Sequence, residues 1–117
     1  MTTTTFDLTT IVEAIEADDA DAQVANYAAD AVVQTFNRDH GPADPVVLRG
    51  RDAIATVLHD VASRGLEHRV DRAVTDGNAG AIQVTCRYPD GTGVVCSSTF
   101  DLEGGLIVRE TRFEVWD

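Results

Sequence analysis

Apolar and polar residues alternate along the last third of the chain, residues 79–116, in three runs of about ten residues. An alternation of period two is typical of a β-strand that buries one face, and Asp90-Gly91 and Gly104-Gly105 between the runs favour tight turns. We therefore predict three long antiparallel strands over residues 79–88, 93–102 and 106–116. Strands of this length twist and coil, so one face of the sheet becomes concave.

The first turn sets the register of the first two strands. If its loop has three residues, the expected cross-strand pairs are Ile82 with Phe100, Val84 with Ser98, and Cys86 with Cys96. One face then holds mainly apolar and small side chains, which are Ile82, Val84, Cys86, Tyr88, Val94, Cys96, Ser98, Phe100 and Leu102. The alternate positions are mostly small or polar, as expected of a sheet with one buried face.

Three upstream segments have apolar residues at the spacing of an α-helix. The first begins near Phe6 with Asp7 or Thr9 in position to cap it, the second spans about residues 19–27, and the third spans residues 51–64 with Gly65 as its C-cap. Residues 31–36 and 66–75 predict two more strands, and residues 37–50, with two prolines and two glycines, predict a polar loop. We expect residues 1–5 to be a frayed tail and residues 1–117 to form a single α+β domain.

The composition narrows the possible partners. The chain of 117 residues has a formal net charge of −11, and its nine basic residues are all arginine. Such a surface repels phosphate backbones and anionic lipids, so we expect neither nucleic acid nor a membrane as a partner. The chain has no apolar run of about 18 residues and no basic-then-apolar leader, so we expect a cytoplasmic protein with two free thiols. Its three histidines lack metal-site spacing, and we expect no metal.

Three segments resemble the nuclear transport factor 2-like superfamily, and within it the SnoaL-like (polyketide cyclase-like) and ketosteroid isomerase-like proteins. They are EADDADAQVANYAADAVV, RGRDAIATVL and FDLEGGLIVRE. The resemblance implies a cone-shaped, curved antiparallel or mixed β-sheet wrapped around three N-terminal helices. It also implies a pocket for a small apolar molecule, chemistry without a cofactor, and a homodimer through the outer face of the sheet.

The resemblance also suggests roles for single residues. The positions at which ketosteroid isomerases have their catalytic groups match Thr35, Ile11 and Ser98 here, or Thr99 instead of Ser98 with a one-residue shift, so we do not expect steroid isomerisation by that mechanism. Polyketide cyclases have an acid/base carboxylate on the last strand, which matches Glu110, while their partner histidine is replaced at Ser98. The pocket positions expected to bind ligand are Tyr27, Thr35, Leu58, Cys86, Cys96, Ser98, Phe100 and Trp116.

Glu110 and Arg112 lie two apart on the last predicted strand and therefore share a face. If that face is concave, Glu110 lies near Ser98 and Arg112 near Cys96, and a desolvated carboxylate held by an arginine could exchange protons. If the strand is turned over, the side chains that face the core are instead Ile107, Thr111, Phe113 and Val115. Apolar periodicity favours the second arrangement and the resemblance favours the first, so the sequence leaves both open.

The other candidates each have a structural alternative. His68 is the natural acid/base partner in a pocket, although a lone histidine on a strand is more often only hydrogen-bonded. Tyr27 is either a donor to ligand or a tie between helix and sheet. Cys86 and Cys96 are expected to be small wall residues, because no base or helix N-terminus is evident beside them. Trp116 is expected at the wide end of the cone or in the dimer interface.

Two hypotheses of function follow. In the first, the protein catalyses cyclisation, isomerisation or dehydration of a small, largely apolar carbonyl compound. Glu110 is then the base, Arg112 orients it, and His68 or Tyr27 polarises the substrate. In the second, the protein is a non-catalytic ligand-binding or accessory homodimer, and the same cavity only binds.

Overall fold

A computed structural model describes residues 6–117, so the tail predicted for residues 1–5 lies outside the described residues. The chain forms three helices, α1 (Leu8–Glu16), α2 (Ala20–Val24) and α3 (Arg51–Ala62). It also forms six strands, β1 (Tyr27–Phe36), β2 (Val46–Arg49), β3 (Glu67–Thr75), β4 (Ala79–Arg87), β5 (Gly93–Glu103) and β6 (Leu106–Trp116). The α+β class predicted from the sequence is confirmed.

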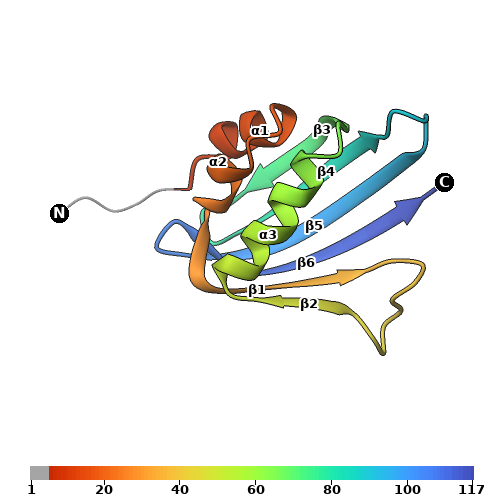
Figure 1. The fold of residues 1–117 in the computed structure, drawn as a ribbon. Helices are drawn as coiled ribbons and strands as arrows, with labels where there is room; N and C mark the ends of the chain where they lie inside the picture. Colours follow the sequence, from red (N-terminus) through yellow and green to blue (C-terminus); the bar gives the residue numbers. More distant parts are fainter. Residues whose placement is uncertain (1–5) are drawn as a thin grey trace.

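The strands form one mixed sheet, and the helices lie together over one of its faces (Figure 1). The strand order is β2-β1-β6-β5-β4-β3, in which β1 and β6 run parallel and all other neighbours run antiparallel. The three long C-terminal strands stand at the centre and toward one edge of this sheet. Among residues 6–117, no helix lies on the other face of the sheet.

The first two helices begin where acidic side chains cap them. Asp7 Oδ1 accepts a hydrogen bond from Thr10 N at 3.3 Å, and Asp19 Oδ1 accepts one from Ala22 N at 3.0 Å. The second helix ends at Val24, earlier than predicted, and Tyr27 begins strand β1, four residues before the predicted start. Tyr27 pairs with Ile107 of β6, and the regular pairing of the two strands resumes at Val32.

The polar loop predicted for residues 37–50 contains a short strand, β2, which pairs with β1. Only four residues take part, and Pro45 precedes them, so the alternation was too short to predict a strand. Helix α3 ends at Ala62, two residues before the predicted end, and Gly65 follows with φ 72°. A glycine accommodates this conformation without strain.

The register of the β4–β5 hairpin differs from the prediction by two residues. Cys86 pairs with Val94 rather than with Cys96, because the loop has five residues and is closed by a hydrogen bond from Tyr88 N to Thr92 O at 2.9 Å. The predicted pairs of Val84 and Ile82 move by the same amount. A shift of two residues leaves every side chain on its predicted face, so the buried face was predicted correctly.

Candidate functional site

One extra residue sets the orientation of strand β6. The pairing of β5 with β6 shifts between Asp101 and Leu102, and Val108 is the unpaired residue on β6. A bulge of this kind moves the alternation of side chains by one position. Ile107 before the bulge and Glu110 after it therefore both face the helices, and they are 1% and 4% exposed.

Of the two orientations considered for the last strand, the structure has the one in which Glu110 and Arg112 face inward. Phe113 and Val115, which the alternative placed in the core, are 50% and 69% exposed. The predicted neighbours of Glu110 and Arg112 on β5 are each wrong by two residues, as in the β4–β5 hairpin. Arg112 pairs with Ser98, and Glu110 pairs two residues further along β5.

The inward side chains enclose a cavity of about 140 Å³ between the concave face of the sheet and the helices. Its walls are mainly apolar, with residues from all three helices, from β1 and from strands β3 to β6. Among the predicted site residues, those that line it are Tyr27, Leu58, His68, Cys86, Cys96, Ser98, Phe100, Glu110, Arg112 and Trp116. Thr35 lies outside this lining.

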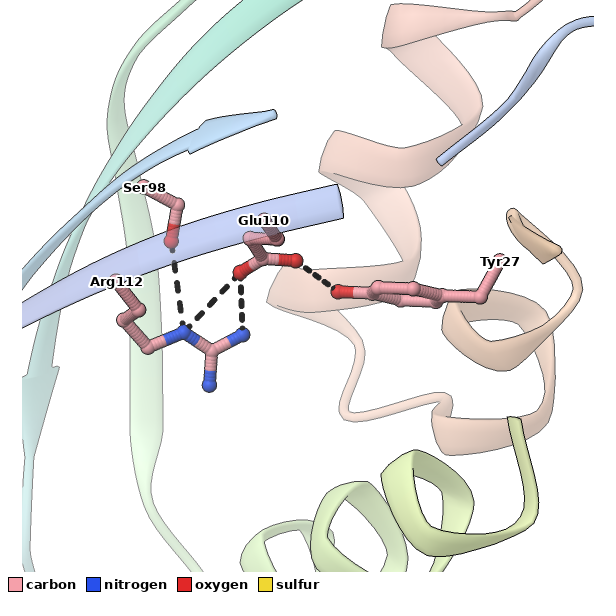
Figure 2. Close-up of polar contacts among 4 residues, drawn as sticks. All are labelled: Tyr27, Ser98, Glu110 and Arg112. Atoms are coloured by element: carbon pink, nitrogen blue, oxygen red, sulfur yellow. Dashed lines mark hydrogen bonds and ion pairs between the residues drawn. The ribbon is translucent and has the colours of Figure 1, made fainter. Parts of the chain in front are cut away.

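Four of these residues form one polar cluster on the cavity wall (Figure 2). The Tyr27 hydroxyl donates a short hydrogen bond to Glu110 Oε1. Arg112 donates to Glu110 Oε2 from Nε at 3.2 Å and from Nη2 at 2.8 Å, and its Nε also lies 3.4 Å from Ser98 Oγ. Strands β1, β5 and β6 thus bring together a hydroxyl, a carboxylate and a guanidinium.

Most of this cluster is buried. The side chain of Arg112 is 23% exposed and that of Glu110 is 4% exposed, so the ion pair is largely removed from water. The charge of Glu110 raises the pKa of Arg112 although burial opposes it, and the guanidinium stays protonated. Burial, together with the charge of Glu110, raises the pKa of Tyr27 well above its usual value, so the phenol keeps its proton and donates it.

The guanidinium keeps donors that a ligand could use. The hydrogen bonds found among residues 6–117 engage only Nε and Nη2 of Arg112. Figure 2 shows the third nitrogen, Nη1, pointing away from Glu110 and Ser98. A ligand oxygen in the cavity would therefore find a charged donor beside a buried carboxylate.

Two aromatic side chains of the cavity lining lie close together. The rings of Tyr88 and Trp116 lie 5.7 Å apart, and the guanidinium of Arg38 lies 5.9 Å from the Trp116 ring. Arg64 donates to the Tyr88 hydroxyl at 2.9 Å. Trp116 and Phe100 both line the cavity, and Phe100 is the more deeply buried of the two.

Asp18 contacts the cavity residue His68 and is a residue that the sequence did not predict at the site. Its Oδ1 lies 2.7 Å from Nδ1 of His68, which joins the turn between α1 and α2 to strand β3. Asp18 and His68 are fifty positions apart in the sequence. Two consecutive aspartates in a turn do not indicate which residue they contact. The only available hint was the Asp18-Asp19 interruption of the helical pattern.

Two negative findings concern residues 6–117 only. No three His, Cys, Asp or Glu side chains lie close enough together to hold a metal ion. No helix in this part of the chain is long and apolar enough to cross a membrane.

A family model for the SnoaL-like domain matches residues 8–110. The chain belongs to the SnoaL-like family. A search of curated proteins finds no match.

Solved structures place this SnoaL-like protein in the same fold as several bacterial proteins. A nuclear transport factor 2-like protein of unknown function from Burkholderia xenovorans LB400 has a TM-score of 0.76 at 22% identity, over 92% of this chain and 79% of that one. An uncharacterised protein with a cystatin-like fold from Silicibacter pomeroyi DSS-3 has a TM-score of 0.70 at 24% identity, over 91% and 71%. An LEH-like epoxide hydrolase of M. tuberculosis has a TM-score of 0.63 at 21% identity, over 93% and 78%. The predicted family and fold are confirmed.

In this SnoaL-like protein, other residues stand at the three positions matched to the catalytic groups of ketosteroid isomerases. Ile11 is an apolar wall residue, Ser98 lies beside Arg112, and Thr35 does not reach the cavity. The polar side chains that do meet are Tyr27, Glu110 and Arg112. These three side chains are therefore the first candidates for chemistry in this cavity.

Proposed function

We propose that this SnoaL-like protein binds a compact, largely apolar carbonyl compound and moves a proton on it, with Glu110 as the base and with no cofactor. The observation that supports this most is the position of Glu110. It is a 4% exposed carboxylate on the wall of an apolar cavity, between the Tyr27 hydroxyl and the Arg112 guanidinium. Carboxylates placed in this way are common proton acceptors in enzymes.

The hydrogen bonds of Glu110 suggest where the proton would go. An ionised carboxylate has about four lone-pair sites. Tyr27 uses one on Oε1, and Arg112 uses two on Oε2, so one site on Oε1 remains. The substrate carbonyl would accept a hydrogen bond from Nη1 of Arg112, which makes the adjacent C–H more acidic, and Oε1 would take that proton.

The cavity volume suggests the size of the substrate. An apolar cavity of about 150 Å³ holds benzene, and this cavity has about 140 Å³. A single ring or a short branched chain fits this space. Removal of such a compound from water would also strengthen its interaction with Arg112.

The test uses Glu110→Gln, which keeps the size of the side chain and removes its basicity. Monocyclic ketones that bind the wild-type protein are incubated in D₂O, and NMR follows exchange of the hydrogens next to the carbonyl. We expect exchange to fall by on the order of 10²–10⁴ while binding persists. Glu103→Gln, an exposed change on β5, is the matched control. Equal exchange in wild type and Glu110→Gln would contradict the proposal.

A non-catalytic binding protein is the second candidate, and one observation favours it. Both oxygens of Glu110 already accept hydrogen bonds from the protein, so the carboxylate has little freedom to approach a substrate. In that case the ketone would bind to the wild-type protein and show no enhanced exchange at all.

We further propose that the protein is a homodimer formed through the outer face of the sheet. Three apolar side chains on that face of β5 and β6, Val95, Phe113 and Val115, are 43%, 50% and 69% exposed. An exposed apolar group on adjacent strands is typical of a protein interface.

A further inference from the structure

A second reactive group lies in the same cavity, apart from Glu110. His68 on β3 pairs with Cys86 on β4, and Cys96 on β5 lies diagonally opposite Cys86, since Cys86 pairs with Val94. All three side chains line the cavity. The structure thus places an imidazole beside a thiol, which the sequence analysis had not expected.

Asp18 completes this group from the turn between α1 and α2. Its carboxylate lies 2.7 Å from Nδ1 of His68, whose side chain is only 10% exposed. Nδ1 has no hydrogen-bond partner in line with it among residues 6–117, so the contact is an ion pair rather than a linear hydrogen bond. The carboxylate favours a protonated ring, and Nε2 remains for the thiol.

The backbone of Asp18 indicates that its side chain is needed. It is the one non-glycine residue of the described chain with positive φ, at 54°. Hydrogen bonds from Asp18 N to Ile15 O and from Asp19 N to Ala14 O close helix α1 as a Schellman motif, with Asp18 at the position that glycine usually occupies. Aspartate tolerates this conformation at some cost, and here it brings a carboxylate to His68.

The surroundings of Cys86 favour its thiolate. The charged or titratable groups that act on the two cysteines are His68 from β3, Cys96 from β5, and Arg112 and Glu114 from β6. The Cys96 thiol, and then His68 and Arg112, lower the pKa of Cys86 to about 5, although burial opposes this. The same contact and burial raise the pKa of Cys96, which keeps its proton. The contact with Cys86, assisted by Asp18, raises the pKa of His68.

We propose that Cys86 is a nucleophile that adds to compact, uncharged α,β-unsaturated carbonyl compounds, with His68 as its proton partner and Asp18 as the residue that positions His68. Sγ of Cys86 forms a bond to the β-carbon, and the electron pair of the C=C bond moves toward the carbonyl. The His68 imidazolium then gives its proton to the α-carbon. The net change is addition of S–H across C=C, which needs no oxidant or reductant.

The site favours this reaction over acyl transfer. Acyl transfer needs donors, commonly backbone N–H groups, aimed at an oxyanion. Strand β4, which holds Cys86, and its neighbour β5 are paired on both sides, so their backbone N–H groups around Cys86 are already used. Addition to an unsaturated carbonyl needs only the thiolate, an apolar space and a proton donor.

N-ethylmaleimide, an uncharged ring that is itself an α,β-unsaturated carbonyl compound, is a suitable probe. Labelling of each cysteine is followed by peptide mass spectrometry between pH 5 and 8.5, with N-acetylcysteine as the reference for the probe. We expect Cys86 to react at least tenfold faster than Cys96 at pH 6, with an inflection well below that of an ordinary thiol near pH 8.5.

Two variants test the roles of its partners. Asp18→Asn keeps a residue that tolerates positive φ and removes the charge, and His68→Gln removes the proton donor. Each should move the inflection of Cys86 labelling toward that of the reference thiol. Asp21→Asn is the matched control, because Asp21 forms an exposed pair with His59 at 2.9 Å.

Thermal unfolding checks that each variant is folded, and Asp18→Gly, with the usual residue of a Schellman motif, replaces Asp18→Asn if needed. An inflection of Cys86 near pH 8.5, no labelling of native Cys86, or a profile that Asp18→Asn leaves unchanged would overturn the proposal. The readout does not depend on Glu110, so this proposal and the proton-transfer proposal can fail separately.

Discussion

Glu110 favours the protonated forms of Arg112 and Tyr27, which both donate hydrogen bonds to it. Its charge is the main cause that raises the pKa of Arg112, and it adds to the effect of burial on Tyr27. The cluster therefore contains one anion, one cation and one neutral phenol, and has no net charge. Such a cluster is tolerated in an apolar cavity because each charge has a partner.

The raised pKa of Tyr27 predicts a loss of stability at alkaline pH. In the unfolded chain the phenol ionises near pH 10, whereas in the folded protein it stays protonated well above that. Its contribution to the free energy of unfolding is therefore complete below about pH 10 and declines as the pH rises toward the folded-state pKa. Urea unfolding between pH 8 and 11 should show a smaller decline for Tyr27→Phe than for wild type. Identical slopes would show that Tyr27 titrates in the folded state like a free tyrosine.

The sequence predicted most members of the site one at a time, but not their contacts. Glu110 and Arg112 were paired by their spacing, while Tyr27 was expected at the end of a helix rather than at the start of β1. Its hydrogen bond to Glu110 joins residues 83 positions apart and depends on the parallel pairing of β1 with β6. Asp18 reaches His68 in the same non-local way.

At the scale of the element, the bulge at Val108 explains why periodicity could not orient the last strand. Before it, odd-numbered Ile107 faces inward, and after it, even-numbered Glu110 and Arg112 do. Phe113 continues the odd-numbered apolar pattern, so the sequence predicts it in the core although it is exposed. One inserted residue reverses the alternation, and no local signal in the sequence marks it.

Gly80 on β4 lies against the ring of Phe100, its cross-strand partner on β5. A Cβ added there would lie 2.5 Å and 2.6 Å from ring atoms of Phe100 and 2.8 Å from the carbonyl oxygen of Val74. Gly80→Ala should therefore lower the free energy of unfolding by about 1–3 kcal/mol. Urea unfolding measures this against Gly41→Ala, where no atom lies within 4 Å of the added Cβ. Equal stability of the two variants would contradict the packing seen here.

At the scale of the whole molecule, the predicted sheet with helices on one face follows from patterns that persist over many residues. The three long strands and the third helix each span nine or more residues in the structure. Short segments such as β2, with four residues, and α2, with five, contain too few repeats of any period to be assigned with their correct bounds.

An apolar patch on the outer face of the sheet supports the prediction that the protein is a homodimer. Val95 pairs with Val115, and the Phe113 ring stacks on Phe36 with centroids 5.4 Å apart, so the four form one apolar patch. Light scattering should give twice the mass of the 12.6 kDa chain. Val115→Asp should shift the protein toward the monomer, because it puts a charge in the patch. Thr56→Asp, at an exposed position of α3 on the helical side of the sheet, is the matched control.

The net charge makes the same dimer sensitive to salt. Each chain has a net charge of −11, so two copies repel at long range while the patch attracts at contact. Salt screens the repulsion, with a Debye length that falls from about 30 Å at 0.01 M to about 10 Å at 0.1 M. The dimer dissociation constant should therefore fall as sodium chloride rises over this range. A dissociation constant that rises with salt would mean that ion pairs, rather than the apolar patch, hold the two copies together.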